Sequence, residues 1–123
     1  MTPKFLIVDS ASSMRNVMRD ILSSEDYTDI IEAENGDEAL ELFSAESPDV
    51  IIMDLSVDGK TGMECLKEIK EKSDDTKVVI CSASAHRELV IEAAKLGATD
   101  FILKPLKPQR LMQAVQKALD SIS

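Results

Sequence analysis

The chain has 123 residues, which favours one domain spanning residues 1–123, and 44% of them are hydrophobic, which argues against intrinsic disorder. The formal net charge of −9 would repel nucleic-acid phosphates and anionic membrane surfaces, so neither is expected as a partner. No stretch approaches the ~20 apolar residues of a membrane span, and no N-terminal segment has the pattern of a secretion signal, so we expect a cytoplasmic protein.

The first half of the chain alternates short apolar runs with segments of helical periodicity. A strand is predicted at 5–8, where the apolar run is too short for a helix, and an amphipathic helix at 14–22, with Ser12 or Ser13 as its N-cap. Then follow a strand at 29–33, a helix through 39–43 that ends before Pro48, and a strand at 50–53.

The second half repeats this alternation. Thr61 is the expected cap of a third helix, and Gly97 is a suitable stop for the fourth. The expected elements are a helix near 63–70, a strand at 78–81, a helix at 88–96, a strand at 101–103 and a helix from 111 to 122. Cys65 and Cys81 form no CxxC pair, so we expect two packed thiols.

Alternating strands and helices of this kind predict an α/β fold. Continuous apolar strands suit a parallel sheet that helices cover on both faces. There are too few units for an eight-stranded barrel, so an open sheet remains. We therefore expect a flavodoxin-like fold, a doubly wound, five-stranded parallel sheet in the order 2-1-3-4-5 with five helices.

Four polar residues stand at the carboxyl ends of the predicted strands: Asp9, Asp54, Ser82 and Lys104. Parallel strands share one carboxyl edge, and ligands bind there, where the strand order reverses. That reversal would bring Asp9 beside Asp54, and two neighbouring carboxylates favour a shared cation, for which Mg²⁺ is the natural choice. With a lysine and a hydroxyl nearby, the set is suited to carrying a phosphoryl group.

The segment Gly59-Lys60-Thr61 matches the end of a nucleotide-binding P-loop, GxxxxGK[ST]. The first glycine of that motif would fall at position 54, which is an aspartate. The segment is therefore interpreted as a turn followed by a helix cap, and Asp54 as the residue that carries the chemistry.

Four stretches of the chain, in this order and spacing, resemble the receiver domain of two-component response regulators. They are the first strand with its acid (5–9, FLIVD), the strand around Asp54 (51–55, IIMDL), Ser82-Ala83, and the segment 97–105 (GATDFILKP). The resemblance spans the whole chain, and the last stretch is its most specific part.

The resemblance implies a catalytic set made of Asp54, Lys104 and Ser82. Asp54 would accept a phosphoryl group from the phosphohistidine of a sensor histidine kinase or a phosphotransfer protein, and Lys104 would pair with the phosphoryl oxygens. Mg²⁺ would be held by Asp9, Asp54 and the backbone carbonyl of Ser56. Such a protein is not a dedicated enzyme, although it catalyses its own phosphorylation and dephosphorylation.

The resemblance also implies a switch. Ser82 would move to hydrogen-bond the phosphoryl group, and Phe101 would swing inward behind it. The face formed by the fourth helix, fifth strand and fifth helix would then bind a downstream protein target, as in chemotaxis or phosphorelay regulators. The family usually has a cis bond before the proline, so Pro105 is a candidate cis-proline. Lys107 and Arg110, nearby, would either help to shape a partner face or, as is usual for such charges, form a solvated face.

Two departures from the family pattern bear on the metal. The family normally has a second acid after the first strand, a direct metal ligand, where this chain has the neutral Ser10, so Mg²⁺ affinity should fall. In the loop after Asp54, Asp58 replaces the usual proline. Ser10 and Asp58 are therefore further candidate ligands, with Asp58 partly compensating for Ser10, although Asp58 also fits a solvated turn.

Two alternatives to a phosphorylation switch remain. The first is a degenerate receiver, a phosphorylation-independent protein-binding module, for which Ser10 is the evidence. The second is a hydrolase of the haloacid dehalogenase class, but those enzymes carry DxD at the first strand, whereas Asp54-Leu55-Ser56 lies on the third. If the chain is complete, its output must run through protein–protein contact.

Overall fold

The computed structural model describes residues 2–122 as one α/β unit with a five-stranded sheet. All strand pairs are parallel, and the strand order β2-β1-β3-β4-β5 confirms the predicted topology. The strands are β1 (Phe5–Val8), β2 (Ile30–Ala33), β3 (Val50–Asp54), β4 (Lys77–Ser82) and β5 (Asp100–Leu103). The helices are α1 (Ser12–Ser24), α2 (Gly36–Glu46), α3 (Gly62–Lys72), α4 (Arg87–Lys95) and α5 (Pro108–Asp120).

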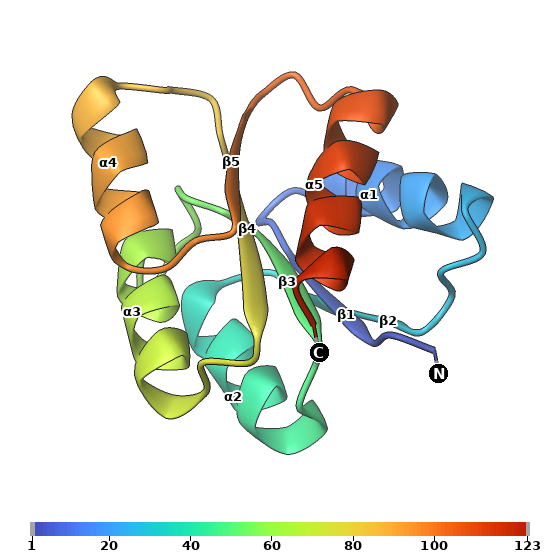
Figure 1. Ribbon diagram of the computed structural model, residues 1–123, viewed down its shortest axis with the longest axis horizontal. Helices are drawn as coiled ribbons and strands as arrows, with labels where there is room; N and C mark the ends of the chain where they lie inside the picture. Colours follow the sequence, from blue (N-terminus) through green and yellow to red (C-terminus); the bar gives the residue numbers. More distant parts are fainter. Residues whose placement is uncertain (1, 123) are drawn as a thin grey trace.

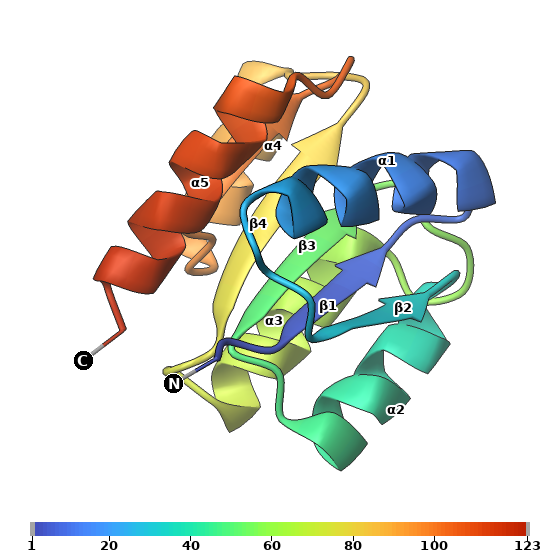
Figure 2. The same ribbon diagram turned by 90° about the vertical axis from the view of Figure 1, so that its right-hand side faces the viewer.

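Helices cover both faces of the sheet. Figures 1 and 2 show α1 and α5 on one face and α2, α3 and α4 on the other, so the sheet is the middle layer of three. The central strands are buried along their whole length, as expected for apolar runs without alternation. Among residues 2–122, no helix combines the length and apolar character needed to cross a bilayer.

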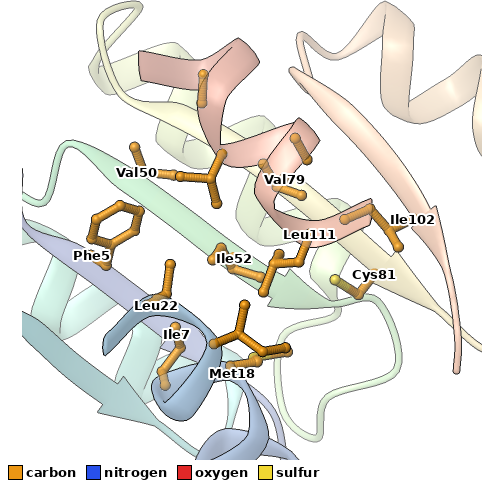
Figure 3. Packing of buried hydrophobic residues seen from close by; sticks show 14 of the residues in the cluster. Phe5, Ile7, Met18, Leu22, Val50, Ile52, Val79, Cys81, Ile102 and Leu111 are labelled. Carbon is orange, nitrogen blue, oxygen red and sulfur yellow. The ribbon is translucent and has the colours of Figure 1, made fainter. Parts of the chain in front are cut away.

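Two hydrophobic clusters hold the helices to the sheet. On the α1–α5 face, Met18 and Leu22 of α1 and Leu111 of α5 pack over Phe5 and Ile52 (Figure 3). On the other face, a second cluster joins residues from α2, α3 and α4 to β1, β3 and β4. Burying each large side chain contributes about 1.5–3 kcal/mol, so the sheet edge that carries the polar residues rests on a well-packed base.

The helix caps differ in how well the sequence predicts them. The cap at Thr61 is confirmed, because its hydroxyl accepts a hydrogen bond from the Glu64 amide and the Glu64 carboxylate accepts one from the Thr61 amide. The predicted cap at Ser12 or Ser13 is wrong. Helix α1 begins one residue earlier, with Ala11 as its N-cap and no side-chain cap.

The loop after β3 is a turn that leads into α3. Gly59 has a φ of 74°, the left-handed region that glycine adopts without strain. A Cβ atom on Gly62 would lie 2.7 Å from the Cα of Leu55 and 3.0 Å from the carbonyl oxygen of Asp54, so α3 begins directly behind the end of β3. The interpretation of Gly59-Lys60-Thr61 as a turn and a cap is therefore confirmed.

Candidate functional site

Asp9, Asp54 and Lys104 meet at the carboxyl edge of the sheet, just beyond or at the ends of β1, β3 and β5. The ammonium of Lys104 donates to Asp9 Oδ2 at 2.8 Å and to Asp54 Oδ2 at 3.1 Å. Only 2% of the Asp9 side chain and 8% of the Asp54 side chain are exposed, against 18% for Lys104. Two nearly buried carboxylates thus share the ammonium group of Lys104, which is distant from both in sequence.

The remaining carboxylate oxygens accept hydrogen bonds from residues close in sequence. Asp9 Oδ1 accepts a hydrogen bond from the Ala11 amide at 2.9 Å. Asp54 Oδ1 accepts longer bonds, both of 3.3 Å, from the amide and the hydroxyl of Ser56. Within residues 2–122, every buried side-chain nitrogen and oxygen has a hydrogen-bond partner. The protein therefore satisfies the polar groups of this site by itself.

Lys104 is held in its charged form. Burial lowers the pKa of its ammonium, but the hydrogen bonds to Asp9 and Asp54 and the charges of the two carboxylates outweigh burial, so the pKa is raised above its ordinary value. At neutral pH Lys104 is therefore an ammonium ion. A cation fixed beside a carboxylate can stabilise negative charge that develops on a transferred group.

Ser82 ends β4 and Phe101 lies within β5, and neither side chain hydrogen-bonds to Asp9, Asp54 or Lys104. The Ser82 hydroxyl is buried and accepts a hydrogen bond from the Ser84 amide at 3.1 Å, while its backbone carbonyl accepts one from the Lys104 amide at 2.8 Å. Phe101 is half-buried against the cluster beneath α2, α3 and α4. The switch roles expected for these two side chains stay predictions.

The donor set bears on whether Mg²⁺ suits the site. Asp9 and Asp54 supply two hard oxygen ligands, and Mg²⁺ is usually held by one or two carboxylates together with water, so these residues fit the ion. The side chains of Ser10, Ser56 and Asp58 are exposed. Residues 2–122 contain no cluster of three or more His, Cys, Asp or Glu side chains that could hold a metal, so Asp58 does not complete an acidic triad with Asp9 and Asp54.

The peptide bond between Lys104 and Pro105 is cis, in agreement with the sequence expectation. Arg110 remains partly exposed and makes a bidentate pair with Asp100, with N–O distances of 2.9 and 2.8 Å. It also donates to the Phe101 carbonyl at 3.2 Å. No local sequence signal predicts that pair, because it depends on how α5 crosses β5. Lys107 is exposed, as expected.

Arg15, which the sequence does not single out, contacts the backbone of this site. Its Nη1 donates to the Asp9 carbonyl oxygen at 2.6 Å, and its Nε donates to Glu32 Oε1 at 2.9 Å. Glu32 lies on β2, where it pairs in register with Ile7. The contact crosses from helix to neighbouring strand, so periodicity alone could not find it.

Comparisons with known proteins agree with this fold. Residues 5–116 match the family model described as "Response regulator receiver domain". The chain is 38% identical over 120 residues to the chemotaxis protein CheY of Bacillus subtilis, covering 98% of this chain and 100% of that protein. It is 39% identical over 117 residues to CheY of Thermotoga maritima, covering 95% and 98%.

A solved structure of the CheX–CheY–BeF₃–Mg²⁺ complex from Borrelia burgdorferi is also similar to this chain. The TM-score is 0.89 at 28% sequence identity, and the match covers 94% of this chain and 88% of that one.

Proposed function

This chain belongs to the response regulator receiver domain family of two-component signalling, and we propose that it is a switch in which Asp54 accepts a phosphoryl group. The observation that carries the proposal is the position of the Asp54 carboxylate, which is nearly buried and lies 3.1 Å from the Lys104 ammonium. The same ammonium also donates a hydrogen bond to Asp9. A carboxylate fixed beside a cation at the edge of the sheet is arranged for nucleophilic attack on phosphorus.

In the proposed reaction, a carboxylate oxygen of Asp54 attacks the phosphorus of a phosphohistidine. The O–P bond forms as the P–N bond breaks, and the departing imidazole nitrogen keeps the electron pair and takes up a proton. Lys104 donates to the phosphoryl oxygens, which spread charge in the transition state. Hydrolysis by water on the same acyl phosphate would reset the switch and regenerate the Asp54 carboxylate.

Mg²⁺, when bound, would neutralise charge on the transferring phosphoryl group. Asp9 and Asp54 are the residues that would hold it, with the Ser56 carbonyl as a further oxygen. Ser10 offers only a neutral hydroxyl where the family has an acid, so we expect weaker metal binding than in a site with three carboxylates.

The proposed readout runs through Ser82 and Phe101. The Ser82 hydroxyl would leave the Ser84 amide and donate to the phosphoryl group, which would make room for Phe101 to turn inward. The surface of α4, β5 and α5 would change with it and bind a protein partner. A sensor histidine kinase or phosphotransfer protein upstream, a protein target downstream and a cytoplasmic location are parts of this proposal.

One observation favours a second candidate, a binding module that is not phosphorylated. Lys104 bridges the carboxylates of Asp9 and Asp54, and Ser10 is a neutral hydroxyl where the family has an acidic metal ligand. A receiver that binds its partner without phosphorylation needs only the ion pairs of Lys104 with Asp9 and Asp54 to keep this edge of the sheet in one conformation. Its output would be the same surface in one fixed conformation.

The test is incubation with acetyl phosphate and Mg²⁺, followed by intact mass measurement and treatment with hydroxylamine, which cleaves acyl phosphates. We expect one phosphoryl group per chain, lost in Asp54→Asn and retained in the matched control Asp58→Asn, whose aspartate is exposed in the next loop. No adduct at any Mg²⁺ concentration supports the binding module. Release of many equivalents of phosphate per chain supports a hydrolase.

The Asp58→Asn control also tests compensation for Ser10. Unchanged Mg²⁺ affinity in this variant would remove Asp58 from the metal site, including any role through water.

A further inference from the structure

Arg15 ties helix α1 to the backbone of the acidic edge. Its guanidinium donates to the Asp9 carbonyl at 2.6 Å and to Glu32 at 2.9 Å, and 15% of its side chain is exposed. The Asp9 carbonyl belongs to the peptide that links Asp9 to Ser10. The orientation of that peptide is set by the ψ angle of Asp9 and the φ angle of Ser10, so it determines the path of the chain between these two residues.

Glu32 holds Arg15 in place. Glu32 Oε2 accepts two hydrogen bonds from Arg19, at 2.9 and 2.7 Å, while Oε1 accepts the bond from Arg15. The hydrogen bond from Arg19 has the largest effect on the pKa of Glu32 and lowers it, and the bond from Arg15 lowers it further, although partial burial raises it. The Glu32 carboxylate therefore stays charged at neutral pH. Glu32 therefore binds Arg15 through one carboxylate oxygen and Arg19 through the other.

With Arg15 in place, every polar group of Asp9 is engaged. Its amide donates to the Ala33 carbonyl at 3.2 Å, its carbonyl accepts from Arg15, and its two carboxylate oxygens accept from Ala11 and Lys104. Loss of the Arg15 bond would free the carbonyl and allow the peptide to rotate. Rotation would displace Asp9 Oδ2 from Lys104.

We propose that Arg15 is a positioning residue that fixes the Asp9–Ser10 peptide, and through it the Asp9 carboxylate, for metal binding at the acidic edge. The expected effect on Mg²⁺ binding rests on the proposed function. The expected effect on the orientation of the Asp9–Ser10 peptide does not. With Ser10 in place of an acid, a bound metal has less hold on this loop, so the fixed peptide matters more. Groups that orient metal ligands affect metal affinity by ~10–100-fold.

A purely structural role for Arg15, joining α1 to β2, is the competing explanation. Arg19 provides the matched control, because it lies one turn later on the same helix and binds the same Glu32. Its other contact is the Ile30 carbonyl at 3.4 Å, and no hydrogen bond joins it to Asp9. Both substitutions remove a helix-to-strand ion pair, but only one removes a bond to the site.

The experiment compares Arg15→Gln, Arg15→Lys and Arg19→Gln by amide NMR of the metal-free protein and by titration with Mg²⁺ alone. We expect Arg15→Gln to shift the Ser10 and Ala11 amide signals and to weaken Mg²⁺ binding ~10-fold. Arg19→Gln should leave these signals in place and change the affinity less than ~2-fold. Arg15→Lys should fall between them, because its ammonium keeps the charge but lacks the planar guanidinium that reaches the Asp9 carbonyl and Glu32 through two different nitrogens.

Equal effects of Arg15→Gln and Arg19→Gln, or unmoved Ser10 and Ala11 signals in Arg15→Gln, would overturn the inference. Should Arg15→Gln fail to fold, Arg15→Lys gives the same comparison with a cation retained. If the unsubstituted protein takes up neither Mg²⁺ nor a phosphoryl group while Arg15→Gln still displaces the Ser10 amide, the proposed function fails. The positioning of the peptide by Arg15 then stands.

Discussion

Replacing Lys104 with methionine removes the cation that two carboxylates share while keeping most of the apolar stem. The lost contacts are two charge-assisted hydrogen bonds, of 2.8 and 3.1 Å, to side chains that are 2% and 8% exposed. Removing one partner from a buried ion pair costs about 3–5 kcal/mol, because the other charge is left unpaired. Lys104 itself is 18% exposed, so water can reach the site. We therefore expect a loss of about 3 kcal/mol, the lower end of that range.

Urea unfolding followed by circular dichroism, in the presence of a chelator, measures this loss. The matched control is Lys107→Met, an exposed lysine in the same loop, which should change the free energy of unfolding by less than ~0.5 kcal/mol. Mg²⁺ should stabilise Lys104→Met more than the unsubstituted protein, because no ammonium then competes for the carboxylates. A loss below about 1 kcal/mol, the range of exposed pairs, would refute the view that Lys104 neutralises a buried pair.

Two further outcomes follow from other charged and buried groups. The hydrogen bond from Arg110 lowers the pKa of Asp100, so the pair stabilises the fold above the ordinary aspartate pKa and this contribution is lost as pH falls toward the lowered value. Asp100→Asn should therefore cost about 1 kcal/mol in urea unfolding at pH 7 and progressively less in acid; a constant difference would contradict this. Burial raises the pKa of Cys65 to about 11 and that of Cys81 to about 12, so neither should react with a thiol reagent at mildly alkaline pH until urea unfolds the chain. Rapid labelling of the native protein would disprove their burial.

The sequence predicts the part of the site that follows from strand geometry. Asp9, Asp54 and Lys104 are far apart in the chain, but each stands at or just beyond the end of an apolar run, and parallel strands bring such ends to one edge. Continuous apolar runs also identify the doubly covered sheet. These features depend on the pattern of apolar residues along the chain and on the parallel direction of the strands, and both can be inferred from short stretches of sequence.

Contacts between a helix and a strand are not predictable in the same way. Arg15 reaches both Asp9 and Glu32 because α1 crosses the sheet beside β2, and the crossing angle is set by packing of the whole core. The bidentate pair of Arg110 with Asp100 depends likewise on how α5 lies over β5. Sequence spacing gives no signal for either pair.

The start of α1 shows a competition between local signals. The Ser12–Ser13 pair predicts a cap, yet the helix begins at Ser12 with Ala11 before it. The carboxylate of Asp9 accepts the Ala11 amide instead, so a site residue holds the chain at the entry to the helix. The hydrogen bond from the Ala11 amide to Asp9 therefore places the N-cap of α1 one residue before the cap that the two serines predict.

A crystal structure with Mg²⁺ and beryllium trifluoride, which has the shape and charge of a phosphoryl group, tests the central claim most directly. The account predicts beryllium on an Asp54 carboxylate oxygen, with the Lys104 ammonium and the Ser82 hydroxyl donating to fluorine, and Asp9 holding the metal. Beryllium bound at another carboxylate, or an Asp54 still paired with Lys104 at saturating concentrations of both reagents, would contradict it.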